Sequence, residues 1–430
     1  MLALDHVTCL GCGCACDDIG IRVHDGRIVE ARQACELGVA WFGDGRVPAR
    51  AMVDGRDVAR DDALDALANR LAAAARPLVY LAPDLSCEAQ RQGVALADWL
   101  RAALDSVTSA TAIGSILAAQ ERGRVSATLG EIRHRADLVV FWGVDPALRY
   151  PRFTSRYAPE PAGIHVPGGR AGRFVVAVDV GDAAGPRDND LRVPLSPSEE
   201  IAALTTLAAA VASPPPSADA PLSALAARLR GARYAAIIAD AETGVAGGSS
   251  RAAALVALAQ AVNGPARGAL CVLRAGGNRS GADAVMTAQT GYPSAVDFAR
   301  GYPRYRPLDG GAAARLERGE VDAAVILGAV ERIPASLREL LARVPAAVIG
   351  PRASASVFAP RCPVIDTGVA GIHEAGTALR MDDVPLPLQQ VVDGPPAAAS
   401  AIRALVERLT KTDAVGASPR RIGTERSRRA

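Results

Sequence analysis

The fold is indicated first by one apolar run and the loop that follows it, Leu138-Val139-Val140-Phe141-Trp142-Gly143-Val144-Asp145-Pro146. An uninterrupted apolar run that ends at a Gly-x-Asp-Pro turn is typical of a strand buried on both faces. Similar short runs recur along the chain, and Ala/Leu/Arg stretches of helical period, such as 88–104, lie between them. This alternation predicts an α/β protein with mostly parallel, doubly wound sheets that carry helices on both faces. The other predicted strands are 78–82, 174–178, 235–239, 270–273, 323–327 and 346–349.

The length of 430 residues exceeds that of a usual single domain, so several domains are expected. The best candidate for a linker is the stretch Ser213-Pro214-Pro215-Pro216-Ser217, because repeated proline ends a helix and resists a sheet. We predict a cysteine-rich N-terminal domain at 1–50, α/β regions at 51–212 and 221–411, a linker at 213–220 and a disordered basic tail at 412–430.

Composition excludes several classes of function. The 48 basic and 46 acidic side chains leave a formal charge of +2, and only 6 Phe, 3 Trp and 7 Tyr are present, so nucleic-acid binding is not expected. The single lysine, Lys411, excludes a lysine-dependent phosphate loop or a Schiff base before the C-terminal helix. The N-terminus lacks a secretory signal and no apolar run approaches about 18 residues. We therefore expect a cytoplasmic protein with no membrane partner.

Cysteines form the sharpest local motif. Cys9, Cys12, Cys16 and Cys35 lie in a Gly-rich N-terminal segment, where thiolates and turned backbone amides suit an iron-sulfur cluster. Zinc is a second interpretation, although zinc ribbons favour two Cys-x2-4-Cys pairs. Four ordinary thiols at a turn are a third, and the additional thiol of Cys14 inside the motif slightly favours it.

Loops that follow predicted strands are candidate ligand sites, because parallel sheets bind ligands at the carboxyl ends of their strands. Glycine at Gly276 would let the backbone approach a phosphate, and Arg274 or Arg279 could clamp it. The same argument applies to the loop after Trp142, which contains Gly143 and Asp145. It also applies to Asp179, which ends the predicted strand 174–178 and whose carboxylate could accept a ribose or guanine hydrogen bond.

Taken in order, these motifs resemble the B subunit of formylmethanofuran dehydrogenase, a member of the molybdopterin oxidoreductase superfamily. The resemblance spans about residues 7–410. It is carried by the segments Cys9-Leu10-Gly11-Cys12-Gly13-Cys14-Ala15-Cys16, Ala34-Cys35-Glu36-Leu37-Gly38, Ser86-Cys87-Glu88, Ala136-Asp137-Leu138 through Pro146, Gly291-Tyr292-Pro293-Ser294 and Glu374-Ala375-Gly376-Thr377.

The resemblance implies cofactors. In that family four N-terminal cysteines hold a 4Fe-4S cluster, and the central domains hold two pterin guanine dinucleotides around tungsten or molybdenum. By resemblance, the cluster ligands here are Cys9, Cys12, Cys16 and Cys35, and the residues facing the pterin nucleotides are Gly143, Asp145, Asp179 and Gly276.

One departure from the family pattern changes the expected chemistry. The family places a metal-ligating cysteine or selenocysteine, followed by histidine, where this chain has Thr111 and Ala112. A neutral threonine hydroxyl is a poor ligand for tungsten or molybdenum. Without the histidine, a proton-transfer partner for formate/CO2 chemistry is also missing. We therefore expect no tungsto- or molybdopterin and no catalytic residue, and the cluster stays an open question.

The departure favours a relative of the dehydrogenase in which hydrolysis replaces oxidation. The chain looks most like the B subunit of the bacterial formyltransferase/hydrolase complex of methylotrophic one-carbon metabolism, which converts formyl-tetrahydromethanopterin to formate through a methanofuran-type carrier. Its expected partners are the A, C and D subunits, and its expected role is structural. The alternative is an active tungsten- or molybdenum-pterin subunit that interconverts formylmethanofuran or formate with CO2.

Overall fold

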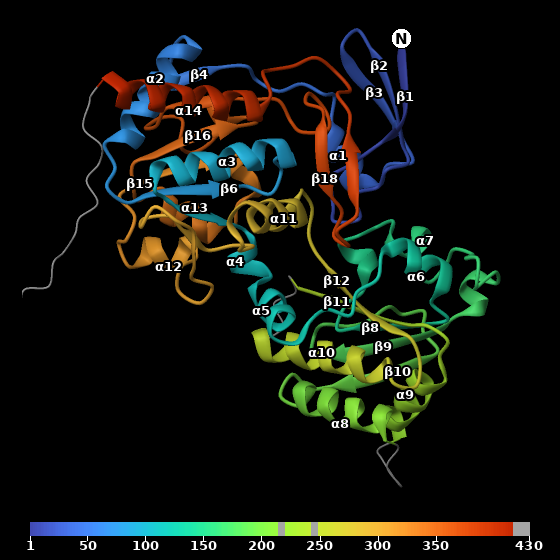
Figure 1. Ribbon diagram of the computed structural model, residues 1–430. Coiled ribbons are helices and arrows are strands. Elements are labelled where there is room, and N and C mark those ends of the chain that lie inside the picture. Colours follow the sequence, from blue (N-terminus) through green and yellow to red (C-terminus); the bar gives the residue numbers. More distant parts are fainter. Residues whose placement is uncertain (214–219, 242–247, 416–430) are drawn as a thin grey trace, which may run out of the picture.

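The computed structural model describes residues 1–213, 220–241 and 248–415. In this part of the chain the backbone forms a nine-stranded, a five-stranded, a three-stranded and a two-stranded sheet. The two larger sheets are the centres of separate α/β units, which lie at opposite ends of an elongated molecule (Figure 1). The predicted α/β class and its multi-domain character are confirmed. No helix of the described residues combines the length and apolarity needed to cross a membrane.

The first unit is built on the nine-stranded sheet. Its central strands β7, β6, β15, β16 and β17 are parallel, and Val79 of β6 pairs with Val325 of β15. Antiparallel strands extend the sheet at both ends. The strand order is β14 (Arg304–Tyr305), β13 (Val296–Asp297), β7 (Ala103–Ser106), β6 (Pro77–Leu81), β15 (Ala323–Leu327), β16 (Ala346–Gly350), β17 (Val364–Asp366), β4 (Ala51–Val53) and β5 (Arg56–Asp57).

Helices cover both faces of this sheet because its parallel strands are mostly apolar, so side chains on both faces must be buried. Val79 and Leu81 pack on one face, whereas Leu78 and Tyr80 of the same strand pack on the other. The first face is covered by α2 (Arg60–Ala72), α3 (Cys87–Leu100), α11 (Arg279–Thr290) and α14 (Ala398–Val415), and the second by α12 (Ala312–Glu317) and α13 (Ala335–Leu341).

The second unit is built on the five-stranded sheet, which is parallel throughout. Its order is β10 (Leu191–Leu195), β9 (Phe174–Val180), β8 (Leu138–Trp142), β11 (Ala235–Asp240) and β12 (Gly268–Leu273). One face is covered by α8 (Glu200–Ala212), α9 (Ala220–Gly231) and α10 (Gly248–Val262), and the other by α6 (Leu129–Arg135) and α7 (Phe153–Arg156).

The boundary between the units differs from the predicted one. Strand β8 pairs with β11, so strands on either side of residues 213–220 belong to one sheet. The chain passes between the units twice instead, through α4 (Thr108–Thr111) and α5 (Ile113–Arg122) and again between β12 and α11. A Pro/Ser-rich stretch predicts where a helix stops, but strand pairing across it depends on contacts distant in sequence. Residues 214–219 of the predicted linker lie outside the described residues.

The N-terminal segment forms a small layer beside both units. Strands β1 (Leu2–Val7), β2 (Ile19–His24) and β3 (Arg27–Arg32) are antiparallel, and α1 (Glu36–Phe42) follows them. The hairpin of β18 (Gly376–Leu379) and β19 (Pro385–Leu388) lies next to this layer (Figure 1). At the other end, α14 continues to Val415, beyond the predicted start of the tail at 412, and residues 416–430 lie outside the described part.

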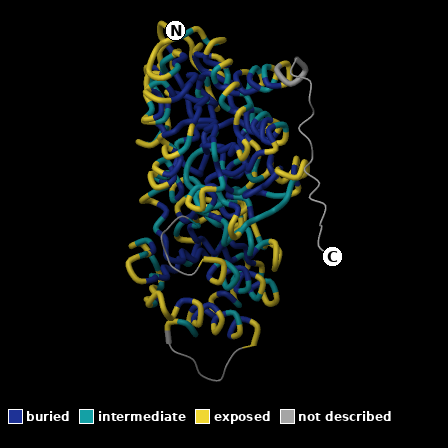
Figure 2. The backbone as a smooth tube through the Cα atoms, turned by 90° about the vertical axis from the view of Figure 1, so that its left-hand side faces the viewer, coloured by how far each residue is buried: buried dark blue, intermediate teal, exposed yellow. Residues whose placement is uncertain are grey.

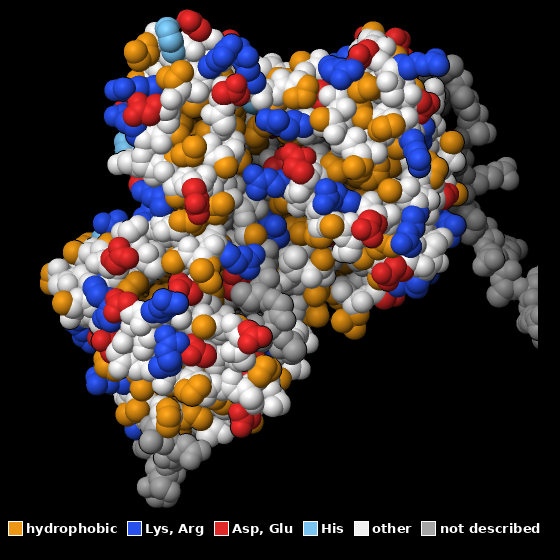
Figure 3. Space-filling model, turned by 180° about the vertical axis from the view of Figure 1, so that it is seen from behind, with side chains coloured by type: hydrophobic (Ala, Val, Ile, Leu, Met, Phe, Trp, Pro, Cys, Tyr) orange, Lys and Arg blue, Asp and Glu red, His pale blue; other side chains and the backbone are white. Residues whose placement is uncertain are grey.

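Buried residues run through both units (Figure 2), and charged residues of both signs are spread over one face (Figure 3). Buried backbone forms a continuous centre along the long axis of the molecule, and exposed backbone is concentrated at its outside (Figure 2). The face seen in Figure 3 carries side chains of both charges without a region of a single sign. That mixture agrees with the formal charge of +2 and favours no polyanionic ligand on this face.

Candidate functional site

The cysteine loop between β1 and β2 folds back on itself. Cys9 N donates to the carbonyl of Cys16 at 2.9 Å, and the N–H of Gly11 points at the Sγ atom of Cys9 at 3.3 Å. Cys9, Cys12 and Cys16 are buried, and Cys35 lies at the start of α1. Burial raises the pKa of the Cys9 thiol, with the charges of Cys16, Cys12 and Cys35 adding to the rise. The loop therefore brings the predicted ligands near one another.

The donor set suits an iron-sulfur cluster in its chemistry, because it combines cysteine thiols with a backbone N–H aimed at sulfur. Among the residues described by the structure, no group of three or more His, Cys, Asp or Glu side chains is arranged to hold a metal ion. The assignment of Cys9, Cys12, Cys16 and Cys35 as cluster ligands thus stays a prediction.

Two arginines of the second unit hold the cysteine loop in place. Arg152 donates to both carboxylate oxygens of Asp18, at 2.7 and 2.6 Å, and Arg156 binds Asp17 and Asp18. Although burial opposes it, these hydrogen bonds and charges lower the pKa of Asp18. The same guanidinium groups oppose the rise that burial causes in the pKa of Cys16, which is raised to about 11.

The cysteine loop packs directly against the loop after β12. A Cβ atom on Gly13 would lie 1.9 Å from the carbonyl oxygen of Arg274, and one on Gly276 would lie 2.4 Å from that of Gly11. Gly277 N also donates to the carbonyl of Leu10 at 3.0 Å. The space that a side chain at position 276 would fill is therefore occupied by the protein's own backbone.

Segments that carried the family resemblance meet in a partly buried polar cluster beside this contact. Ser86 Oγ donates to Glu374 at 2.5 Å, and Glu88 accepts from the backbone N–H of Thr377 at 2.9 Å. The Asn278 side chain donates to the carbonyl of Leu85 at 2.9 Å and accepts from the N–H of Leu379 at 2.8 Å. These side chains join three distant segments to one another, so their role here is structural.

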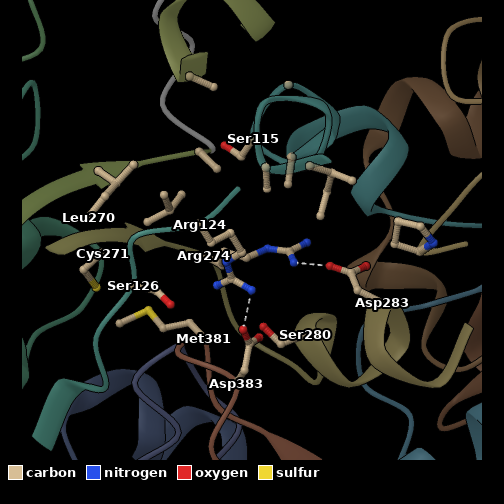
Figure 4. A pocket seen from close by; sticks show the side chains of 18 of the residues that line it. Ser115, Arg124, Ser126, Leu270, Cys271, Arg274, Ser280, Asp283, Met381 and Asp383 are labelled. Atoms are coloured by element: carbon tan, nitrogen blue, oxygen red, sulfur yellow. Dashed lines mark hydrogen bonds and ion pairs between the residues drawn. The ribbon is translucent and has the colours of Figure 1, made fainter. Parts of the chain in front are cut away.

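A cavity of about 640 Å³ lies between the two units. Its walls come from α5, α10, α11, the edge strand β12 and the tip of the β18–β19 hairpin. Most of the side chains that line it are small and apolar (Figure 4). Thr111 lines this cavity, whereas Gly143, Asp145, Asp179 and Gly276 do not. The predicted metal-ligand position and the predicted nucleotide positions are therefore not brought to one cavity.

One wall of the cavity carries a buried ion pair. Arg274 binds Asp283 (Figure 4). Arg274 also donates through Nη2 to Thr108 Oγ1 at 2.8 Å, and Thr108 donates to the second oxygen of Asp283 at 2.5 Å. Burial raises the pKa of Asp283, against the lowering effect of Arg274. Arg274, predicted as a phosphate clamp, is thus bound to a carboxylate that sequence analysis did not identify. Nothing in the sequence pairs these positions, because they meet only through the turn into α11.

Thr111 is the last residue of α4. Its hydroxyl donates to the carbonyl of Val107 at 3.1 Å, a bond within the same helical turn. Ala112 then leaves helical geometry, with φ −131° and ψ 6°, before α5 begins. The position to which the resemblance assigns the family's metal ligand therefore carries a hydroxyl bound to the backbone and is followed by a side chain without a polar atom.

The remaining predicted nucleotide positions have partners within the second unit. Asp179 accepts from Arg192 at 2.7 Å and from the N–H of Gly185 at 2.8 Å. Asp145 accepts from the N–H of Ala147 at 3.0 Å and caps a short 3-10 turn at 146–148. Gly143 has φ +60°, which favours glycine at this turn. Their proposed contacts to a pterin nucleotide stay predictions.

Arg251 is a buried cation that sequence analysis did not identify. Its Nε atom donates to Glu200 at 2.7 Å, and the same carboxylate accepts from Trp142 Nε1 at 2.8 Å. Its Nη2 atom has no hydrogen-bond partner within the described residues and lies near the turn at Gly143. Because Glu200 is 51 positions away from Arg251 in the sequence, no local pattern could have predicted the pair.

A second cavity of about 260 Å³ lies where residues 40–47 meet the carboxyl ends of β6 and β15. Its lining includes Asp84, Arg332 and His373. Asp84 accepts from the N–H of Ala329 at 2.8 Å, and burial raises its pKa to about 6. Burial also lowers the pKa of His373, whose Nε2 atom lies 2.7 Å from the carbonyl oxygen of Gly45.

Comparison with known proteins adds the family context. The chain is 31% identical over 412 residues to the B subunit of the tungsten-containing formylmethanofuran dehydrogenase 2 of Methanocaldococcus jannaschii, covering 91% of this chain and 94% of that protein. The corresponding protein of Methanococcus maripaludis is 28% identical over 432 residues, covering 96% of this chain and 99% of that protein. No family model matches the chain.

The fold also has a solved counterpart. A chain of the formyltransferase/hydrolase complex (FhcABCD) from Methylorubrum extorquens, crystallised in complex with methylofuran, superposes with a TM-score of 0.73. The match covers 85% of this chain and 99% of that chain at 24% identity. At this identity, the similarity establishes a shared fold.

Proposed function

Because the chain belongs to the family of formylmethanofuran dehydrogenase B subunits, we propose that it is the non-redox, structural B subunit of a formyltransferase/hydrolase complex. In the proposed reaction sequence, a formyl group passes from tetrahydromethanopterin to a methanofuran-type carrier. Water then adds to the formyl carbon and the C–N bond to the carrier breaks, which yields formate and the free amine. No electron leaves the substrate, so this chain needs no redox centre.

The observation that carries the proposal is the environment of Thr111. A thiolate or selenolate donates strongly to tungsten or molybdenum, whereas this neutral hydroxyl is bound to the carbonyl of Val107. The adjacent Ala112 can neither hold nor transfer a proton. The fold shared with the FhcABCD chain is consistent with the same proposal.

The expected partners are the hydrolytic A subunit together with the C and D subunits, with formyl transfer assigned to D. Two rigid units with helices on both faces offer broad surfaces for such contacts. A protein without its own chemistry can still hold two active sites at a fixed separation, so that a carrier-bound formyl group moves between them.

A second candidate is an active tungsten- or molybdenum-pterin dehydrogenase chain. The names of both curated relatives favour it, since each is described as tungsten-containing. The large cavity beside Thr111 favours it as well. In that case another ligand, or the threonine alkoxide, would have to replace the thiolate.

The two candidates are separated by measurements on the assembled complex. We expect no stoichiometric tungsten or molybdenum by mass spectrometry of the metals, and formyl-to-formate conversion without viologen reduction. Thr111→Val removes the hydroxyl at nearly constant volume and should leave that conversion unchanged. The matched control is Thr287→Val, which removes another hydroxyl from the cavity wall that is bound within its own helix, to the carbonyl of Asp283 at 2.7 Å.

The dehydrogenase is supported instead if the complex holds about one such metal per chain and oxidises formylmethanofuran with viologen as acceptor. Loss of conversion in Thr111→Val, with normal assembly and an unaffected Thr287→Val control, would assign a chemical role to the threonine and contradict the structural one.

A further inference from the structure

The hairpin of β18 and β19 is rooted in one unit and touches the other. Strand β18 packs on α3 and α11 of the first unit. From there the hairpin reaches towards the second unit, where its turn lies near α6 and α7 (Figure 1). Its tip, residues 380–384, forms part of the cavity wall through Met381, Asp382 and Asp383.

Contacts of the tip with the second unit are few and differ in burial. Asp382 accepts from Leu129 N, at the first turn of α6, at 2.6 Å. Asp383 pairs with Arg124 at 2.7 Å, and these two side chains are 45% and 56% exposed. The Arg380 guanidinium lies 5.6 Å from the centre of the Tyr157 ring. An exposed ion pair contributes little to stability, so the Arg124–Asp383 contact is the easiest of these to break.

The backbone that joins the units has a break beside the cavity. Helix α4 packs beside β7 of the first unit, and α5 packs on α10 of the second. Ala112 separates the two helices with a non-helical φ of −131°. A rotation there, together with one in the second connection between β12 and α11, would move the second unit relative to the first without unfolding either helix, which is how hinge residues act.

We propose that the hairpin tip 380–384 is a strap that closes the cavity between the two units, and that the Arg124–Asp383 ion pair is its releasable contact. Opening breaks this contact and the Leu129–Asp382 hydrogen bond and rotates the chain around Ala112, while the buried Arg380–Asp382 pair keeps the turn itself intact. The proposal does not depend on which reaction the complex performs, because it concerns access to the cavity alone.

Cys271 offers a natural probe of this opening. It lines the cavity and is 4% exposed (Figure 4). Burial raises the pKa of its thiol, with the charge of Asp382 adding to the rise and those of Arg380 and Arg124 opposing it. Cys362 is 6% exposed and packs under α13 in the first unit, away from the strap. The alkylation rate of Cys271 therefore reports opening of the strap, and that of Cys362 reports general loosening of the first unit.

The experiment measures alkylation of both cysteines by iodoacetamide in the assembled complex, resolved by peptide mass spectrometry. Asp383→Asn keeps a residue type that tolerates the φ of +63° at this position, and Arg124→Gln removes the other charge. Each should raise the rate at Cys271, taken per thiolate, about two- to fivefold, the range expected for losing an exposed ion pair, with no change at Cys362. The rate is taken per thiolate because the charge of Arg124 also lowers the pKa of Cys271. The double variant should give no further rise, because both changes remove one contact.

Salt and a distant ion pair serve as controls. High salt should raise the rate at Cys271 in the unmodified complex but not in Asp383→Asn, since salt screens exposed charges. Asp61→Asn, which breaks the exposed pair with Arg408 on α14, should change neither cysteine. An unchanged rate at Cys271 in both strap variants would overturn the proposal, and so would an equal rise at Cys362.

Discussion

Asp84 should make the stability of this protein depend on pH in the opposite sense to an ordinary carboxylate. It follows β6, is 8% exposed, and lines the smaller cavity. Burial raises its pKa to about 6 from 3.8, with the N–H of Ala329 and the charge of Arg332 opposing the rise and Glu331 adding to it. Between about pH 4 and pH 6, Asp84 of the folded protein therefore holds a proton that the unfolded chain releases.

The sign and size follow from this difference in pKa. The contribution of Asp84 to stability is fully present below the unfolded pKa and is lost as the pH rises from about 4 through about 6. A difference of about two units corresponds to about 3 kcal/mol of unfolding free energy. Asp84→Asn removes the titration and can still accept from Ala329. The gain in unfolding free energy caused by Asp84→Asn should therefore be about 3 kcal/mol larger at pH 8 than at pH 4.

The assay compares the urea unfolding of the unmodified protein with that of Asp84→Asn between pH 4 and 8. His373 lines the same cavity, and its depressed pKa adds an opposite slope to each curve, so the difference between the curves is the quantity to plot. Asp57→Asn is the control, because the exposed carboxylate of Asp57 binds Arg50 and has a lowered pKa. The difference in unfolding free energy between this variant and the unmodified protein should therefore be flat above about pH 5. A flat difference for Asp84→Asn, or one that falls with pH, would refute the reasoning.

Three other substitutions test the packing and the cysteine loop. Gly13→Ala forces a Cβ atom to within 1.9 Å of a neighbouring backbone carbonyl and should lower stability by about 1–3 kcal/mol in thermal unfolding, whereas Gly231→Ala, with open space around it, should not. Arg173→Met leaves four carbonyl oxygens without their buried donor and should cost about 3–5 kcal/mol in urea unfolding; Arg228→Met, at an exposed ring contact, should cost under about 1 kcal/mol. If the cysteines hold a cluster, anaerobically purified protein should contain about four irons per chain with thiolate-to-iron absorbance, and Cys12→Ala should lose both; colourless, iron-free protein would contradict the cluster.

Secondary structure was largely determined by local sequence. Every strand predicted from an apolar run is present, including 138–142 and 323–327 with both ends as expected. Such runs are reliable because a parallel strand covered by helices on both faces must be apolar at each position. Helix ends were less accurate: the helix predicted over 88–104 stops at Leu100, since Arg101 adopts a left-handed conformation that the sequence does not announce.

The motifs could also be recognised in the sequence, but the contacts that their residues make in the folded protein could not. Ser86 and Glu374 belong to separate segments of the family resemblance, yet only the structure shows that they bind one another. Gly276 was predicted as part of a ligand loop, and the structure shows the backbone of the cysteine loop packed closely against it. A glycine is compatible with a close approach or with a positive φ, and only the tertiary structure shows which applies and what approaches.

What the sequence alone determined is therefore local: the buried strands, the clustered cysteines, and the absence of a soft ligand and histidine at positions 111 and 112. What the tertiary structure decided is which distant segments meet. The pairing of β8 with β11, the Arg274–Asp283 pair and the contacts of the hairpin tip 380–384 each join residues through folded geometry. Local periodicity reports whether a side chain is buried, but the neighbour against which it is buried depends on chain topology and on packing between elements.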